Sequence, residues 1–311
     1  MNVVVTGGAG FVGSHLVDAL IARGDTVLVY DDLSTGTSEN LTAAIASGRC
    51  ELRIADVSQG IACAEPVSEV YHLASPASPP AYLSRPLETL AVGSEGTRHA
   101  LELAQRNGAR FLLASTSEVY GDPHEHPQRE SYWGNVNPVG PRSVYDEAKR
   151  FAEALTTAHH HALGTEVAIV RIFNTYGPRL AEGDGRVVSN FICQALRGEP
   201  LTVYGTGEQT RSLCYVSDLV RGLQQACATS HTSPINLGNP IEMTVLEIAT
   251  MIVEATKSSS PIIHQSLPQD DPTRRRPDIS LATATLGWSP HVAVADGIND
   301  TIAYFAAQLS E

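Results

Sequence analysis

The sequence is poor in several features that mark particular protein classes. It has only five cysteines in 311 residues, odd in number, far apart and without a Cys-x-x-Cys pair, which argues against a disulfide framework or a zinc site. No apolar run reaches the roughly 18 residues that a membrane-spanning helix needs. Basic side chains are also scarce, 21 against 34 acidic ones with a formal net charge of -13, which argues against a polyanion such as DNA as the main partner.

We also expect no signal peptide. Residues 1–6 are already typical of a buried strand, which leaves no room for the charged, apolar and cleavage regions of a signal peptide. We therefore expect a cytoplasmic protein with neither a membrane nor a nucleic-acid partner. We expect no metal site, because the three consecutive histidines 159–161 would point in different directions on a helix.

The first half of the chain alternates short β-branched runs with longer amphipathic stretches. The strand-like segments are Val3–Thr6, Thr26–Tyr30, Glu51–Ile54, Val70–Leu73, Phe111–Ala114 and Val167–Ile172, and the helix-like ones are Phe11–Arg23, Leu87–Arg106 and Ser143–Ala162. Continuous apolar strands that alternate with helices indicate a parallel sheet covered on both faces. The sequence thus predicts an α/β fold, a Rossmann-type doubly wound parallel sheet.

After about Pro178 this alternation ends. A glycine-containing charged segment follows at Glu182–Arg186, then a helix candidate at Val188–Arg197, a glycine-rich turn at Tyr204–Gly207 and a proline- and arginine-rich stretch at Pro268–Pro277. Such segments suit a smaller C-terminal lobe that grips a substrate. We expect a dinucleotide-binding Rossmann domain over 1–175, rejoined by part of 206–240, and mainly a substrate-binding lobe over 176–311.

A glycine-rich segment, residues 6–13, follows the first expected strand and opens the first expected helix. Gly7 would allow a tight turn, Gly10 a close approach of the backbone to a pyrophosphate, and Gly13 close packing of helix on strand. The alternative is an ordinary glycine-rich turn. Asp31, at the end of the second strand, favours the dinucleotide site because it can accept hydrogen bonds from ribose hydroxyls. Asp31 and Asp32 would repel a 2′-phosphate, so the sequence predicts NAD rather than NADP.

Tyr145 and Lys149 lie four residues apart in an expected helix, so both side chains project from one face. A free tyrosine has a pKa of about 10; a nearby ammonium and an oxidised nicotinamide would favour the phenolate and make Tyr145 a base. The alternative is a surface pair. Thr116 follows the strand that ends at Ala114, where open α/β sheets bind ligands, and could share a substrate oxygen with Tyr145. A serine- and threonine-rich turn or helix cap is the alternative there.

Together these residues resemble the extended short-chain dehydrogenase/reductase family, whose members act on nucleotide sugars. Within that family the chain is similar to the UDP-glucuronate decarboxylases, also called UDP-xylose synthases. The segments that carry this similarity are His72–Pro80, Thr116–Glu118, Arg171–Arg179, Asp184–Asn190 and Arg274–Asp278. The resemblance spans nearly the whole chain, and it implies a homodimer formed through helices of the Rossmann lobe.

The resemblance implies a role for each matching residue. The implied catalytic residues are Thr116, Glu118, Tyr145, Lys149 and Arg275. Those implied to contact NAD are Gly7, Gly10, Phe11, Val12, Gly13, Asp31, Asp32, Asp56, Val57, Leu73, Ala74, Ser75, Tyr145 and Lys149. Those implied to contact a UDP-sugar are Tyr82, Ser117, Asn174, Arg179, Arg186, Val187, Asn190, Tyr204, Arg211 and Arg275. One position departs from the family: Gly93 stands where an asparagine near the cofactor is expected.

The implied activity converts UDP-glucuronate to UDP-xylose. Oxidation at C4 of the sugar creates a β-keto acid, which loses CO2, and hydride then returns. The enolate oxygen would lie within reach of Tyr145 and Thr116, which would stabilise its charge. Arg275 would orient the carboxylate, since a guanidinium fork suits a carboxylate, and would place a water or itself near C5 for protonation. Glu118 would position the sugar. The alternative for residues 274–276 is a solvated charge run balanced by residues 270 and 271.

Three other functions stay open. A nucleotide-sugar 4,6-dehydratase needs a general acid beside the glutamate, where this chain has Ser117. A 4-epimerase has no need of Glu118. A non-catalytic NAD sensor is a third alternative, although such proteins usually lose the tyrosine or the lysine, and Tyr145 and Lys149 are both present. The sequence leaves open whether the base is uracil or thymine and whether the 4-keto pentose is released.

Overall fold

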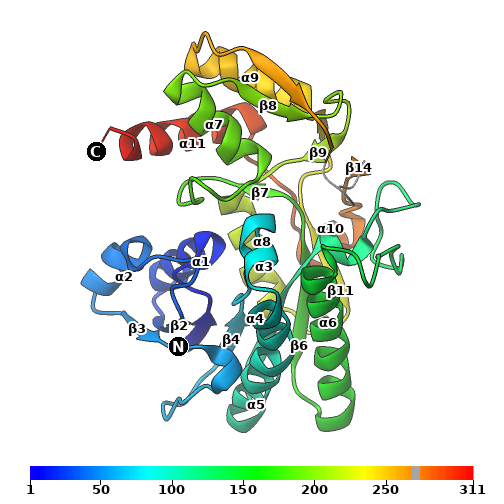
Figure 1. Ribbon diagram of the computed structural model, residues 1–311. Coiled ribbons are helices and arrows are strands. Elements are labelled where there is room, and N and C mark those ends of the chain that lie inside the picture. The colour runs from blue at the N-terminus through cyan, green and yellow to red at the C-terminus, as the bar shows by residue number, and fades with distance from the viewer. Residues whose placement is uncertain (268–273, 311) are drawn as a thin grey trace.

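The computed structural model describes residues 1–267 and 274–310. A seven-stranded parallel sheet in the order β11-β6-β5-β4-β1-β2-β3 forms the centre of the larger lobe (Figure 1). Its strands are β1 (Asn2–Thr6), β2 (Thr26–Asp31), β3 (Cys50–Ile54), β4 (Glu69–His72), β5 (Arg110–Thr116), β6 (Val167–Ile172) and β11 (Pro234–Leu237). The predicted Rossmann-type fold is confirmed.

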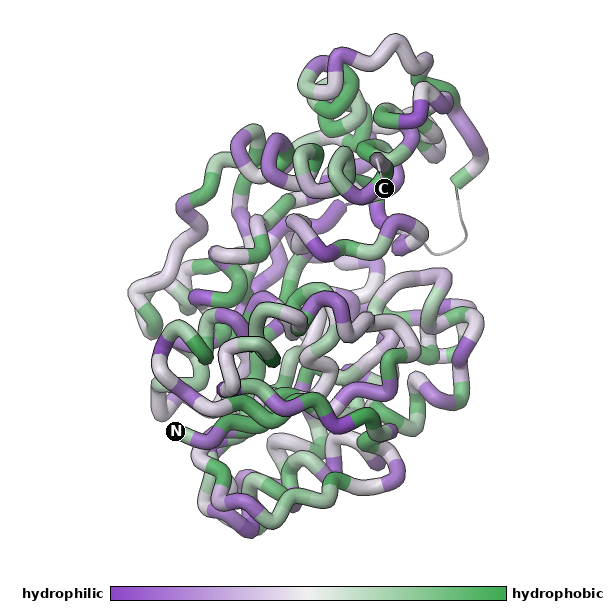
Figure 2. Tube along the Cα trace, turned by 90° about the vertical axis from the view of Figure 1, so that its left-hand side faces the viewer, coloured by the Kyte–Doolittle hydropathy of each residue, from purple (hydrophilic) through white to green (hydrophobic). Residues whose placement is uncertain are grey.

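Helices cover both faces of this sheet. On one face lie α1 (Phe11–Ala22), α2 (Thr42–Ala46), α8 (Val216–Ala228) and α10 (Ser280–Leu286); on the other lie α4 (Pro86–Ala91), α5 (Thr97–Asn107) and α6 (Ser143–Leu163). Because side chains alternate along a strand, Val3 and Val5 of β1 enter the first core while Val4 enters the second. Figure 2 shows hydrophobic residues along the strands of this sheet.

The smaller lobe contains a third core between helices and short strands. Its helices are α7 (Val187–Arg197), α9 (Val245–Thr256) and α11 (Val294–Gln308). Its strands form two small sheets, β8 (Leu201–Tyr204) with β13 (Ile262–Gln265), and β9 (Thr210–Ser212) between β12 (Glu242–Thr244) and β14 (Arg274–Arg275). The remaining short elements are α3 (Pro79–Ser84), β7 (Thr175–Tyr176), β10 (Cys214–Tyr215), η1 (Ser38–Leu41), η2 (Val57–Gln59), η3 (Val92–Gly96) and η4 (Ser117–Tyr120).

The expected elements agree with the observed ones to within a few residues, with one exception. The helix expected over 87–106 is divided by the π-helical turn η3 at Val92–Gly96. Strand β11, which comes from within 206–240, lies beside β6 in the central sheet. The division of the chain at residue 175 stays a prediction. Among the helices of the described ranges, none is long and apolar enough to cross a membrane.

Candidate active site

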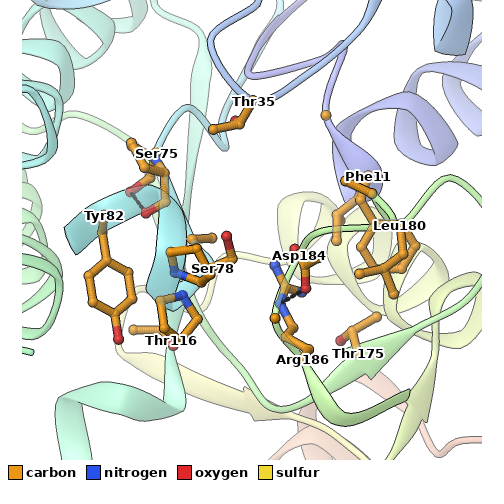
Figure 3. Close-up of a pocket in the computed structure, with 18 of the residues that line it drawn as sticks. Phe11, Thr35, Ser75, Ser78, Tyr82, Thr116, Thr175, Leu180, Asp184 and Arg186 are labelled. Atoms are coloured by element: carbon orange, nitrogen blue, oxygen red, sulfur yellow. Dashed lines mark hydrogen bonds and ion pairs between the residues drawn. The ribbon is translucent and has the colours of Figure 1, made fainter. Parts of the chain in front are cut away.

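A cavity of about 930 Å³ lies between the two lobes, at the carboxyl ends of the central strands. Every catalytic, cofactor-binding and substrate-binding residue predicted above lines it. Figure 3 shows Tyr82 and Thr116 on one side of the cavity, and Asp184 and Arg186, joined by an ion pair, on another. The structure therefore brings the predicted residues together, while the role of each stays a prediction.

The glycine-rich turn closes one end of the cavity. Gly7 has a φ of +72°, and a Cβ atom there would lie 2.7 Å from the backbone nitrogen of Ala74. A Cβ atom at Gly13 would lie 2.1 Å from the carbonyl oxygen of Gly7. Only glycine fits at either position, and this close packing lets α1 begin at Phe11 with its N-terminus at the cavity wall.

Acidic side chains at strand ends are held by the backbone on the same side. The carboxylate of Asp31 accepts hydrogen bonds from the N–H groups of Ala9 and Leu33, both at 2.9 Å. Burial raises the pKa of Asp31 above its ordinary value. Asp56 likewise accepts from the N–H of Ser58 at 2.8 Å. These bonds fix the orientation of both carboxylates at the cavity wall.

Tyr145 and Lys149 are both buried on α6. The Lys149 Nζ donates to the carbonyl oxygen of Ala114 at 2.8 Å and lies 5.9 Å from the centre of the Tyr145 ring. The Tyr145 ring stacks on that of Tyr82, with centroids 5.2 Å apart and planes 7° apart. The side chain of Thr116 lowers the pKa of the Tyr145 phenol and lines the same cavity. The phenol is therefore oriented by stacking on Tyr82, with the Thr116 hydroxyl in the same cavity.

Burial shifts the proton affinities of this pair in opposite directions. It raises the pKa of Tyr145 to about 12, a rise that the hydrogen bond from Thr116 reduces. It lowers the pKa of Lys149 to about 8. In the protein alone Tyr145 thus holds its proton at neutral pH, and it needs a further positive charge nearby before it can act as a base.

Glu118 lies between two arginines. Its Oε2 accepts from Nη2 of Arg142 and its Oε1 from Nη1 of Arg275, both at 2.7 Å. Burial alone would raise the pKa of Glu118, but the charges of Arg275 and then Arg142 outweigh it and hold the pKa at about 2. Glu118 is consequently an anion at neutral pH, which makes it a poor general acid.

Arg275 is 2% exposed, so the alternative of a solvated charge run is wrong for this residue. The acidic partners proposed for that run, residues 270 and 271, lie outside the described residues. Arg142 is the functional side chain that sequence reasoning missed. Its position three residues before Tyr145, at the N-cap of the helix that carries Tyr145, was the available signal.

The arginines of the smaller lobe have protein partners of their own. Nη2 of Arg179 lies 2.7 Å from Oδ2 of Asp18 on α1, and Nε of Arg186 lies 2.8 Å from Oδ1 of Asp184. Arg211 is the β-sheet partner of Arg275, on strands β9 and β14. The walls contributed by this lobe therefore present cations that are oriented by ion pairs and by strand pairing.

Comparison with known proteins agrees with this geometry. The model of the NAD dependent epimerase/dehydratase family matches residues 3–238. The chain is 53% identical over 305 residues to UDP-glucuronic acid decarboxylase 1 of Arabidopsis thaliana, covering 98% of this chain and 70% of that protein. This chain belongs to the NAD dependent epimerase/dehydratase family. Its relatives at about 53% identity are named UDP-glucuronic acid decarboxylase. A homologue of the same name from Danio rerio is 53% identical over 308 residues, covering 99% of this chain and 73% of that protein.

Solved members of the epimerase/dehydratase family share the fold. The UDP-glucose 4-epimerase of Thermotoga maritima, solved with UDP-glucose, superposes with a TM-score of 0.92 at 30% identity and covers 99% of this chain and 100% of its own. The UDP-glucuronic acid 4-epimerase of Bacillus cereus, solved with UDP-glucuronic acid and NAD, gives 0.87 at 27% identity, with 99% and 100% covered. The predicted membership of the extended dehydrogenase/reductase family is confirmed.

Proposed function

We propose that this protein is an NAD-dependent UDP-glucuronate decarboxylase that forms UDP-xylose. The observation that carries the proposal is the position of Glu118 between Arg142 and Arg275, in the same cavity as Tyr145 and Thr116. Two arginines therefore line the cavity that holds the group that would act at C4 of the sugar. The names of the homologues at 53% identity support the same activity.

The glycine-rich end of the cavity fits NAD. A Cβ atom at Gly7 or Gly13 would fill the space between turn, helix and neighbouring strand, and α1 begins where a pyrophosphate needs N–H donors. Asp31 is held where it can accept from ribose hydroxyls and oppose a 2′-phosphate. Bound NAD would accept a hydride from C4 and later return it. Its positive charge would also supply what Tyr145 needs to lose its proton.

The chain's own residues account for the other steps. Tyr145 takes the proton of the C4 hydroxyl, while Thr116 holds the phenol in place. The 4-keto uronic acid then loses CO2, because the electrons of the broken C5–C6 bond pass to the C4 oxygen as an enolate. A proton added at C5 in place of CO2, and a hydride returned to C4, would then complete UDP-xylose. Hydrogen bonds from Tyr145 and Thr116 to that oxygen stabilise the charge in a buried site, where such bonds are strongest.

Three observations weigh against the alternative functions. A 4,6-dehydratase needs an acid where this chain has Ser117, and Glu118 is held as an anion by its arginines. The 4-epimerases among the solved structures are 27 to 30% identical to the chain, against 53% for the decarboxylases. An NAD sensor needs neither Tyr145 nor Lys149, and both line the cavity.

We also propose a homodimer formed by helices of the Rossmann lobe. Helix α4 packs on α6, and these two helices expose large apolar side chains at Leu87, Leu90 and Phe151. A second copy would cover them, since exposed apolar patches commonly mark interfaces. A UDP-sugar is the substrate in this proposal. The cytoplasmic location expected from the sequence stays a prediction.

The test of the proposed function is to incubate purified protein with UDP-glucuronate, with and without added NAD. CO2 release and nucleotide-sugar products are followed by mass spectrometry. The expected result is CO2 with UDP-xylose and no net NADH. Unchanged UDP-glucuronate, together with a dehydrated product from UDP- or TDP-glucose in a parallel reaction, would instead identify a dehydratase. UDP-galacturonate without CO2 would identify an epimerase.

A further inference from the structure

A row of polar side chains crosses the central sheet next to the cavity. Ser115 of β5, Arg171 of β6 and Asn236 of β11 are register partners on neighbouring strands, so their side chains leave the sheet on the same face. Helix α6 covers that face, and its Glu153 contacts both Ser115 and Arg171. Two residues earlier, the same face of β5 and β6 belongs to the apolar core. The polar row therefore interrupts a hydrophobic layer beside the catalytic helix.

The carboxylate of Glu153 is held from two sides. Arg171 donates to it twice, from Nε to Oε1 at 2.9 Å and from Nη2 to Oε2 at 2.8 Å. The Ser115 hydroxyl donates to Oε1 at 2.6 Å. Arg171 is fixed in turn by Tyr120, whose hydroxyl accepts from Nη1 at 3.0 Å and whose ring centre lies 4.9 Å from the guanidinium carbon. Because two-point pairing with an arginine is directional, the carboxylate has one defined position.

This position is on the side of α6 that carries Lys149. Glu153 and Lys149 lie four residues apart on the helix, so both project from the same face. Lys149 donates to the carbonyl oxygen of Ala114 at 2.8 Å, and the next residue of β5, Ser115, donates to Glu153. The lysine and the carboxylate are thus anchored to consecutive residues of one strand.

Glu153 supplies negative charge near a lysine that burial would otherwise neutralise. Two other ionisable side chains lie near Lys149, and burial keeps both uncharged at neutral pH: His72 of β4 has a pKa of about 3 and Tyr145 one of about 12. Burial lowers the pKa of Lys149 to about 8, and the charge of Glu153 opposes this lowering. Without Glu153, Lys149 would therefore lose its proton at a lower pH.

Stability alone gives no reason for an ion pair at this place, because the cost of desolvation offsets much of the attraction within a buried pair. Both Glu153 and Arg171 are only 12% exposed. We propose that Glu153 is a positioning residue of the catalytic pair: held by Ser115 and Arg171, its carboxylate keeps Lys149 charged beside Tyr145. The inference rests on the proposed function, in which Tyr145 loses its proton, since a cation nearby favours the phenolate.

The test measures the ionisation of Lys149 directly, because the chain has only two lysines and the other, Lys257, is exposed. In a Lys257→Arg background, protein labelled with carbon-13 at lysine Cε gives a single lysine signal in NMR spectra, and its chemical shift is followed as the pH is raised. Glu153→Gln should lower the pKa of Lys149 by about one pH unit, because it removes an opposite charge. The alkaline fall in kcat for CO2 release should move to lower pH by a similar amount. KM for UDP-glucuronate should change by less than about threefold, since Glu153 lies outside the cavity lining.

A second glutamate of α6 provides the matched control. Glu147→Gln removes the same charge from the same helix, at a side chain that is 39% exposed and paired with Arg150, and should leave the pKa of Lys149 as in wild type. If Glu153→Gln lowered turnover equally at every pH and left the pKa of Lys149 unchanged, Glu153 would only support the fold and the proposal would be wrong.

A shorter side chain covers the case in which Glu153→Gln does not fold. Glu153→Asp keeps the charge but withdraws it by one methylene group, so it should lower the pKa of Lys149 by a smaller amount. An unchanged pKa in that variant would equally contradict the proposal. If the wild type released no CO2, the proposed function would fail, and the NMR titration would still show whether Glu153 keeps Lys149 charged.

Discussion

At the scale of single residues, the site depends on two ionisable groups whose burial is only partly offset by neighbouring charges and hydrogen bonds. Tyr145 and Lys149 are both buried, and each is pushed toward its uncharged form. Lys149 finds an acceptor in the Ala114 carbonyl rather than in the phenol. Without its cofactor, Tyr145 therefore keeps its proton at neutral pH and does not act as a base. A positive charge arriving beside Tyr145 would lower the pKa of the phenol, because it favours the phenolate, and would make the base available only in the loaded enzyme.

Replacing Tyr145 by phenylalanine should keep the stacking on Tyr82 and remove only the hydroxyl. We expect kcat to fall about 10²- to 10⁴-fold, the usual contribution of a positioned acid or base. Binding of UDP-glucuronate should change by less than about tenfold, as one neutral hydrogen bond is lost. Steady-state CO2 release and calorimetry would measure both. Tyr132→Phe, at a residue that does not line the cavity, is the control. A Tyr145→Phe protein with near-normal turnover would remove this residue from the mechanism.

At the scale of elements, the predictions succeeded where the signal is local. Six of the seven strands of the central sheet were predicted as apolar, β-branched runs, and their predicted bounds agree with the observed ones to within two residues, whereas β11 was not predicted as a strand. The π-helical turn η3 was not predicted. At this turn the chain packs closely on α6, where a Cβ atom at Gly93 would lie 2.7 Å from Cβ of Ala148 and 3.0 Å from its carbonyl oxygen. At position 93, where the family resemblance leads one to expect asparagine, this chain has glycine, and Ala148 on α6 occupies the space that a side chain would need.

This contact predicts a coupled pair of substitutions. Gly93→Asn should clash with Ala148 and destabilise the protein by about 1–3 kcal/mol, the usual cost of overpacking. Ala148→Gly should cost about 1 kcal/mol through lower helix propensity. The double variant should be more stable than the sum of the two losses predicts, because the glycine at 148 makes room for the asparagine. A urea double-mutant cycle measures this coupling, and strictly additive losses would show that the two positions do not compete for space.

His72 at the end of β4 joins three elements. Its Nδ1 lies 2.7 Å from the hydroxyl of Thr6 on β1, and its Nε2 lies 3.2 Å from that of Thr97 on α5. Burial, and then the charge of Lys149, lower the pKa of His72 to about 3. The folded protein therefore keeps this imidazole neutral, whereas the unfolded chain protonates it below pH 6.5. The stability that depends on neutral His72 is present above pH 6.5 and is lost progressively as the pH falls toward 3.

This linkage predicts a specific loss of stability in acid. Between pH 6.5 and 5 the free energy of unfolding should fall by about 2 kcal/mol through His72 alone, at about 1.4 kcal/mol per pH unit. His72→Gln can still bond to both threonines but has no proton to take up, so its loss over the same range should be smaller. Urea midpoints at pH 7.5, 6.5 and 5 provide the measurement. His161→Gln, at an exposed histidine of α6, should keep the wild-type pH dependence, and an unchanged slope in His72→Gln would contradict the assignment.

At the scale of the whole molecule, the sequence predicted which residues meet but not how they pair. The strand-end rule places Thr116 and Glu118 at the cavity, and periodicity places Tyr145 on the facing helix. The Arg142–Glu118–Arg275 cluster joins positions 24 and 157 residues apart. These pairings depend on how β14 of the smaller lobe packs against the turn after β5. That packing determines which acceptors Arg275 contacts and brings Arg142 to the same carboxylate, Glu118. Nothing local in the sequence records that packing.

The proposed dimer is the prediction that belongs to this scale. Leu87 on α4 is 76% exposed and Phe151 on α6 is 52% exposed, and the two helices pack together at the surface of the lobe. If a second copy covers this face, Leu87→Glu with Phe151→Glu should place unpaired carboxylates in the interface and yield a monomer, because burying an unpaired charge is costly. Sedimentation velocity at micromolar concentrations would measure the change.

A matched control separates the interface from general surface effects. Trp133 and Val139 are also large, apolar and exposed, but they lie on the segment between η4 and α6 rather than on α4 or the body of α6. Trp133→Glu should therefore leave the proportion of dimer unchanged. Because Tyr145 is on α6, six residues before Phe151, a dimer through this helix would also stabilise the catalytic element, and the monomeric variant should lose CO2 release at lower temperature than wild type. A wild-type monomer, or a Leu87→Glu, Phe151→Glu dimer, would move the interface elsewhere.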